Sequence, residues 1–132
     1  MNKICTDINQ SKVLAEILPI ESADMHYNNV SIKGINYVDE YRAELMDYNT
    51  AQKVLSKYLV NPMFEIVPCW SLSALLGVLP EGVIENYYAP NLQKEEGKYS
   101  IAYGNEKLLC IADNPIDACV EMVLKLHELN LL

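Results

Sequence analysis

Basic residues are scarce in this 132-residue sequence. Ten lysines and arginines, of which only Arg42 is an arginine, stand against eighteen acidic residues and give a formal net charge of −8. Proteins that read nucleic acids need clustered basic side chains, because the release of counterions from phosphates supplies most of their affinity. An acidic surface also repels anionic membranes. We therefore expect neither a nucleic acid nor a membrane as a partner.

Long apolar runs are missing too. The longest strongly apolar stretch, residues 72–79, is far shorter than the ~20 residues that cross a bilayer. The first residues, Met1 to Asp7, lack the apolar region of a secretory signal peptide. These absences predict a chain that stays in the cytoplasm.

Patterns for metals and cofactors are absent as well. No two cysteines have the C-x-x-C spacing of a zinc site, and only two histidines, His26 and His127, could assist one. Neither of the glycine-rich loops that hold nucleotide phosphates occurs. We predict no metal and no cofactor. The cysteines are expected to be reduced thiols that pack as small hydrophobic residues: Cys5, Cys69, Cys110 and Cys119.

The sequence offers little for nucleophilic catalysis. No G-x-S-x-G elbow surrounds a serine, and Glu95-Glu96 lies in a polar stretch that indicates a solvated loop. A conceivable combination is Cys69 as nucleophile with His127 as base. We favour the alternative in which Cys69 is buried beside Trp70 and His127 lies at the rim of a helix face, so no catalytic residue is predicted.

What the sequence does contain indicates a single globular domain over residues 1–132. Hydrophobic residues make up 51% of it, and no linker, repeat or low-complexity tract interrupts it. Asp7 and Gln10 have the spacing of a capping box before a helix over 8–18, which Pro19 ends. Further along, the spacing predicts a strand within 29–38 and then a helix from Val38, which breaks near Asn49 and resumes over 50–60. A strand is predicted over 64–67, and Pro68 either ends it or places it at a sheet edge. A helix from a Ser71 cap to Gly77 follows.

The last third has the clearest pattern. Alternating apolar residues on either side of Gly104 predict a hairpin over about 98–111. Asn114 then caps a long helix over about 115–129, and Asn130 fits the left-handed residue of a Schellman ending. A strand pair followed by a well-capped helix predicts an α+β fold, in which helices pack on a small antiparallel sheet.

Tyrosine is the one over-represented aromatic residue, with nine tyrosines against one tryptophan and one phenylalanine. Tyrosine buries its ring and keeps its hydroxyl in water, which suits half-covered surfaces and interfaces. Packing at the edge of the core is the other interpretation. If the tyrosines form an interaction surface, its members are Tyr87, Tyr88, Tyr99 and Tyr103.

Three stretches resemble a family of short uncharacterised proteins of bacterial genomes and their prophage-like elements. They are residues 10–12 with 22–25, residues 68–76, and residues 113–119 through Leu132. The resemblance implies an accessory protein of a mobile element. It brings no activity, cofactor or catalytic residue to this chain.

These observations favour a non-catalytic cytoplasmic protein that binds another protein or itself. The alternative is a small enzyme or ligand-binding protein with a pocket near Trp70, Cys69 and His127. A weaker alternative is an acidic inhibitor of a DNA-binding protein, which requires carboxylates clustered on one face.

Overall fold

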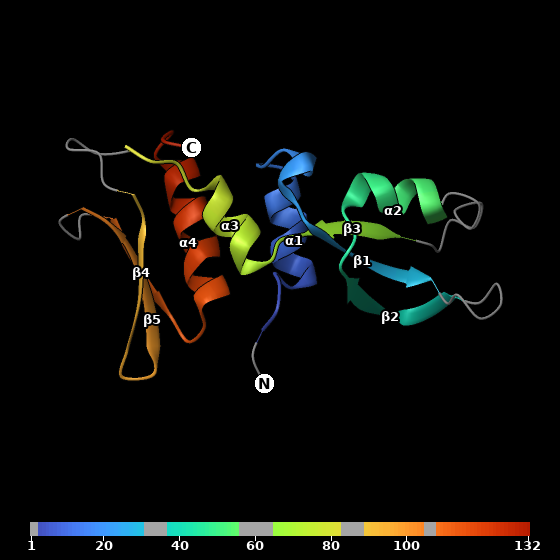
Figure 1. Cartoon of the computed structure of the whole chain (residues 1–132), viewed down its shortest axis with the longest axis horizontal. Helices are drawn as coiled ribbons and strands as arrows, with labels where there is room; N and C mark the ends of the chain where they lie inside the picture. Colours follow the sequence, from blue (N-terminus) through green and yellow to red (C-terminus); the bar gives the residue numbers. More distant parts are fainter. Residues whose placement is uncertain (1–2, 31–36, 56–64, 83–88, 105–107) are drawn as a thin grey trace. The chain divides into compact units, whose positions relative to one another are not determined.

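The computed structural model describes residues 3–30, 37–55, 65–82, 89–104 and 108–132 (Figure 1). The chain divides into two compact units, which we call the N-terminal unit (Asp7–Ser71) and the C-terminal unit (Leu72–Leu132 with Met1–Thr6). Helices and two small antiparallel sheets confirm the predicted α+β class. The single domain predicted over residues 1–132 stays a prediction, because the compactness of each unit does not say whether either folds alone.

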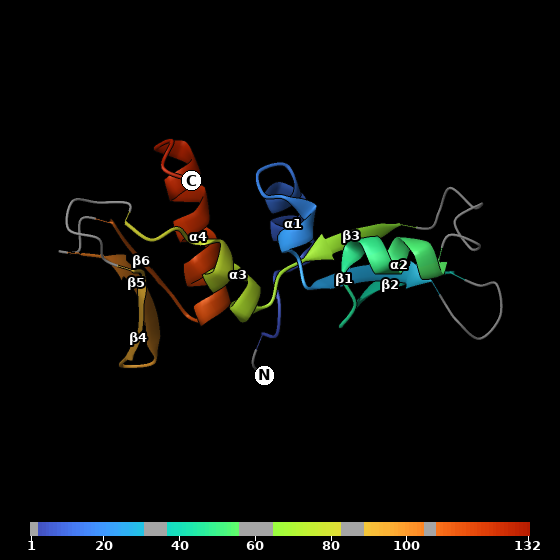
Figure 2. The same cartoon turned by 45° about the horizontal axis from the view of Figure 1, so that its top comes forward.

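The N-terminal unit is a three-stranded antiparallel sheet with short helices. Its strand order is β2-β1-β3, and α1 and α2 pack against β3 (Figure 2). The buried residues at its core include Leu14, Met25, Val67 and Trp70. The elements are α1 (Ile8–Ala15), a 3-10 helix η1 (Ile20–Ser22), β1 (Met25–Val30), β2 (Tyr37–Glu44), α2 (Tyr48–Leu55) and β3 (Ile66–Cys69).

Helix α1 begins as the sequence predicts. The Gln10 backbone N–H donates to the Asp7 carboxylate at 2.8 Å, and the Gln10 side chain accepts from the Asp7 N–H at 3.0 Å. This reciprocal pair satisfies two backbone donors that a helix start otherwise leaves without partners. The helix ends at Ala15, earlier than predicted. The backbone N–H groups of the next two residues donate to carbonyls three residues back, as in a 3-10 turn, and the α-helical pattern stops there.

The first part of the helix predicted from Val38 is wrong, whereas the part predicted over 50–60 is confirmed as far as Leu55, and its last residues, 56–60, lie outside the described residues. Residues 37–44 form β2, which pairs antiparallel with β1 so that Asn28 faces Arg42. The spacing of apolar residues here fits either element, and pairing with β1 decides between them. Helix α2 starts at Tyr48 and not near Thr50, because the Asp47 carboxylate accepts the backbone N–H and the hydroxyl of Thr50 at 2.7 and 2.9 Å.

Strand β3 contains the proline that the sequence placed at a strand end or a sheet edge. Among the described strands it pairs with β1 only and forms an edge of the sheet, where a residue without an N–H is tolerated. Pro68 faces His26 in the register, and the strand continues to Cys69. The edge interpretation is confirmed.

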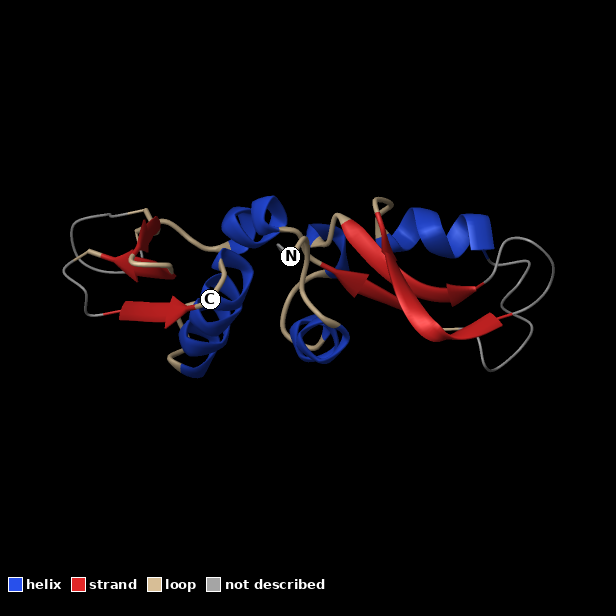
Figure 3. Ribbon diagram, turned by 90° about the horizontal axis from the view of Figure 1, so that it is seen from below, coloured by secondary structure: helices blue, strands red, loops and turns tan. Residues whose placement is uncertain are grey.

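The C-terminal unit is a second three-stranded antiparallel sheet, with order β4-β5-β6, on which α4 packs through β5 and β6 (Figures 2 and 3). The hairpin predicted over 98–111 is confirmed as β5 and β6. Buried residues such as Ile101, Cys110, Cys119 and Val123 form its core. The elements are α3 (Leu72–Val78), β4 (Asn91–Glu95), β5 (Lys98–Tyr103), β6 (Leu108–Ala112) and α4 (Pro115–Glu128).

Both ends of α4 confirm the prediction. The Asn114 side chain accepts the Asp117 backbone N–H at 2.8 Å, and Pro115 occupies the first turn. At the other end Asn130 has a φ of 58°, and the Leu131 N–H donates to the Leu126 carbonyl at 2.8 Å. These bonds form the Schellman ending. Helix α3, by contrast, does not stop at Gly77 but runs to Val78.

Candidate functional site

The proposed nucleophile and base lie in different units. Cys69 is fully buried on β3 of the N-terminal unit, whereas His127 is exposed in the last turn of α4. Trp70 is also fully buried, and its indole N–H donates to the Ser22 hydroxyl at 2.9 Å. A substrate reaches neither the Cys69 sulfur nor the Trp70 ring in this structure.

Two of the three cysteines of the C-terminal unit, Cys110 and Cys119, are poor nucleophiles. Burial raises the pKa of the Cys119 thiol from 9.0 to about 11, and it also raises the pKa of Cys110. A thiol needs to ionise before it attacks, so a raised pKa lowers the reactivity of both side chains at neutral pH. In the part of the chain that the structure describes, no three histidine, cysteine or acidic residues gather as a metal site, and no helix is long and apolar enough to cross a membrane.

Two of the four tyrosines of the predicted surface, Tyr99 and Tyr103, are among the described residues. Tyr87 and Tyr88 lie outside the described residues. Tyr103 is fully buried, and its hydroxyl donates to the Pro80 carbonyl at 2.7 Å, so it is a core residue and offers no contact surface. Tyr99 is half-buried, and the Lys94 ammonium lies 5.5 Å from the centre of its ring.

His26, which the sequence did not single out, belongs to a buried polar network in the N-terminal unit. Its Nδ1 lies 2.7 Å from the Met46 carbonyl, and its Nε2 lies 3.0 Å from the Asn28 amide nitrogen. Because a carbonyl only accepts, Nδ1 carries the proton and Nε2 accepts from Asn28. The ring is fully buried and ties β1 to the turn after β2, which indicates a structural role.

The exposed face of the C-terminal sheet is the best candidate for a functional surface. Side chains alternate between the two faces of a strand, and buried Ile101, Tyr103 and Cys110 occupy the face toward α4. The register places Gln93, Ser100 and Ile111 side by side on the opposite face. We call this opposite face of β4, β5 and β6 the outer face.

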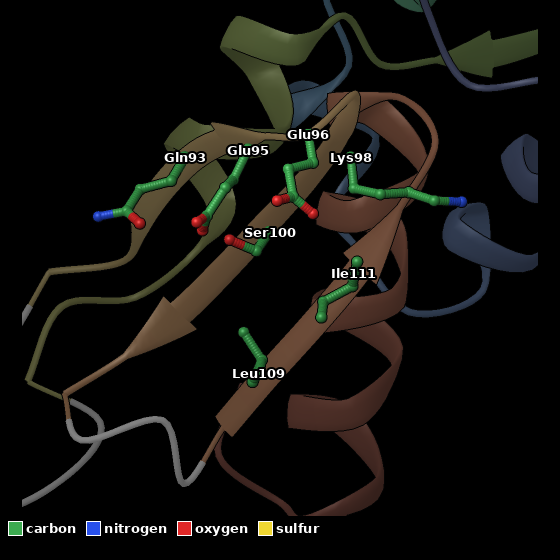
Figure 4. Close-up of a pocket in the computed structure, with 7 residues that line it drawn as sticks. All are labelled: Gln93, Glu95, Glu96, Lys98, Ser100, Leu109 and Ile111. Carbon is green, nitrogen blue, oxygen red and sulfur yellow. The ribbon is translucent and has the colours of Figure 1, made fainter.

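A hollow of about 290 Å³ lies on the outer face (Figure 4). Its floor at β6 is apolar, since Leu109 is half-buried and Ile111 remains 54% exposed. The side at β4 and the following turn carries two carboxylates. The residues that line the hollow are Gln93, Glu95, Glu96, Lys98, Ser100, Leu109 and Ile111.

The charge of the hollow is negative. Among the described residues, Lys98 is the one basic residue that lines the hollow. Its side chain extends away from the two glutamates in Figure 4 and pairs with Asp113. Both glutamates are exposed, and neither has an ion-pair partner in the part of the chain that the structure describes.

This site is not apparent from the sequence, because the polar stretch around Glu95-Glu96 is typical of a solvated loop. Glu95 is the last residue of β4, and Glu96 and Gly97 form the two-residue turn into β5 with φ values of 50° and 78°. Two positive φ values define the type I′ hairpin turn, for which a glycine between alternating segments is the sequence signal. Gly97 was that signal.

Comparisons with protein-family models, with curated proteins and with solved structures gave no match to this chain.

Proposed function

We propose that this chain acts by binding another protein and that the outer face of the C-terminal sheet is the contact surface. The observation that carries the proposal is Ile111, a large aliphatic side chain that is 54% exposed beside half-buried Leu109 and is rimmed by polar residues. An apolar centre with a polar rim is the usual anatomy of a protein interface. The resemblance to short prophage-associated proteins adds the proposal that the partner interaction serves a bacterial mobile element, in the cytoplasm.

The open shape of the hollow favours a protein over a small molecule. Sites for small ligands enclose roughly 300–1,000 Å³ and cover most of the ligand. The hollow holds about 290 Å³ and lies open on a sheet face. A single side chain of a partner fits such a space, with the surrounding sheet as the remainder of the contact.

The test introduces a charge at the centre of the outer face. Ile111→Lys leaves the fold intact, because the residue is exposed and lysine is well tolerated on edge strands. Val54→Lys is the matched control, since Val54 is an aliphatic residue that is 50% exposed on α2 of the other unit. We would capture proteins from the native host with each variant and measure the affinity of any retained partner.

We expect a partner that binds the unchanged chain and V54K alike, and that binds I111K about tenfold or more weakly. Identical partners and affinities for all three chains would contradict the proposed surface. Light scattering on the three purified chains tests self-association. If the unchanged chain and V54K are dimers and I111K is a monomer, the partner is a second copy of the chain.

A further inference from the structure

We infer that the hollow on the outer face receives a lysine or arginine side chain from a basic segment of the partner protein. The inference rests on the proposed function and adds the chemistry of the partner. The hollow has negatively charged side chains at one side and apolar side chains at the opposite side (Figure 4).

The first argument is electrostatic. Glu95 and Glu96 present two carboxylates to the hollow, while Lys98 pairs with Asp113. Lys94 is the neighbouring basic residue on β4, and its ammonium lies over the Tyr99 ring on the other face of the sheet. Opposite charge across an interface raises the association rate and excludes like-charged partners, so this surface selects a cation.

The second argument is the apolar side of the hollow. Lysine and arginine carry aliphatic stems that cover apolar surface while the charged head stays near water or a carboxylate. Leu109 and Ile111 lie on β6, whereas Glu95 ends β4 two strands away and Glu96 lies in the turn that follows it. Half-buried Ser100 lies between the two sides on β5. A lysine or arginine of the partner can therefore lay its aliphatic stem on the apolar side of the hollow at β6 and direct its charged head toward the glutamates. Arginine fits best, since its planar head can bond a carboxylate at two points.

The same charges disfavour the other occupants. Two copies that met through their outer faces would bring the four carboxylates of Glu95 and Glu96 together, and like charges across an interface weaken it. The chain as a whole carries −8, which opposes self-association further. A nucleic acid is excluded by the same sign of charge. A basic protein segment is the occupant that both the charge and the apolar floor accommodate.

The experiment is an NMR titration of the full-length, isotope-labelled chain with three short peptides. The probe is acetyl-Leu-Arg-Leu-amide, and the comparisons replace arginine by glutamate or by norleucine, which keeps a stem without its charge. We expect the arginine peptide to shift amide signals of residues 91–103 and 108–112 on β4, β5 and β6, with a weaker effect of the norleucine peptide and none of the glutamate peptide. Added salt reduces the affinity.

Matched variants assign the effect to the hollow. E95Q/E96Q removes both carboxylates, and we expect the affinity for the arginine peptide to fall roughly three- to tenfold. The control E81Q/E128Q removes the same amount of charge from exposed residues of the same unit that do not line the hollow, and it should leave the affinity unchanged.

The outcomes separate this inference from the proposed function. If the arginine peptide leaves the outer face unperturbed, or if it binds E95Q/E96Q as tightly as the unchanged chain, the basic partner is wrong. The proposed contact surface would still stand when I111K loses a captured protein that E95Q/E96Q retains. If I111K retains every partner, the contact surface itself is wrong. A dimer that I111K dissociates would make a second copy the occupant and would overturn the inference.

Discussion

Two glycines of the C-terminal unit lie in opposite backbone environments. Gly77 lies in the last turn of α3, and a Cβ atom added there meets nothing within 4 Å. We expect Gly77→Ala to raise the free energy of unfolding by about 0.5–1 kcal/mol, because glycine loses more backbone entropy in a helix than alanine. Gly97 has a φ of 78°, so Gly97→Ala places a side chain in the left-handed region and should destabilise the unit. Urea unfolding measures both, and a destabilised G77A would contradict the first expectation.

Glu96 lowers the stability of the fold through its backbone conformation, while its carboxylate serves the proposed contact. It holds a φ of 50°, which costs a non-glycine residue about 1–2 kcal/mol. Asparagine tolerates this conformation well and is favoured before glycine in a type I′ turn. We expect Glu96→Asn to stabilise the chain in thermal unfolding and to weaken binding of the arginine peptide. A variant that is more stable and binds the peptide unchanged would show that Glu96 has no part in the contact.

Tyr103 gives the chain a specific dependence on alkaline pH. Burial is the main cause that raises the pKa of its hydroxyl from 10.0 to about 12. The folded state therefore keeps this proton above pH 10, where the unfolded state loses it, so the stabilising contribution is complete below pH 10 and is lost as the pH rises toward 12.

Tyr103→Phe removes both the titration and the hydrogen bond to Pro80. Near neutral pH the variant should lose about 1 kcal/mol of unfolding free energy. Between pH 10 and 12 its stability should fall less steeply than that of the unchanged chain. Urea unfolding across this range, with Tyr99→Phe as the control at a half-buried tyrosine, measures the difference. Parallel pH profiles for Y103F and the unchanged chain would contradict the assignment.

At the scale of elements, α4 depends on its first turn. Asn114 accepts the Asp117 N–H and also donates to the Asp117 carboxylate at 2.7 Å, and that carboxylate pairs with Lys3 at 2.7 Å. We expect Asn114→Ala to cost about 1–2 kcal/mol of unfolding free energy, and Asn114→Asp to recover part of the loss through the restored cap. Thermal unfolding followed by circular dichroism measures both. Equal stability of N114A and the unchanged chain would show that the cap contributes nothing.

The elements that the sequence predicts well carry their own local signals. The capping box of Asp7 and Gln10 and the Schellman ending at Asn130 each involve residues within six positions of one another, and the structure confirms both. Strand β2 has no such signal. Its conformation is set by pairing with β1 across the sheet, and the spacing of its apolar residues is compatible with a helix.

The candidate site could be predicted only in part for the same reason. Alternation along β5 separates Tyr99, Ile101 and Tyr103 from Ser100, but it does not say which set α4 covers. The sequence therefore leaves Tyr103 either in an interaction surface or at the edge of the core, and the structure shows that it is buried. Likewise Glu95 and Ile111 are far apart in sequence, and only the pairing of three strands brings them to one face.

At the scale of the whole molecule, the length of the two units predicts that they unfold together. Each has about 65 residues, a length at which a folded chain buries only about 60% of its surface and is marginally stable alone. We therefore expect one cooperative transition, as the predicted single domain requires.

Trp70 is the only tryptophan and lies in the N-terminal unit, so its fluorescence reports on that unit, whereas circular dichroism reports on both. Gly97→Ala changes a turn of the C-terminal unit, where we expect it to reduce stability. If the units are coupled, G97A lowers the fluorescence and dichroism midpoints by the same amount. A fluorescence midpoint that stays unchanged while the dichroism midpoint falls would show two separately folding domains and would contradict the prediction.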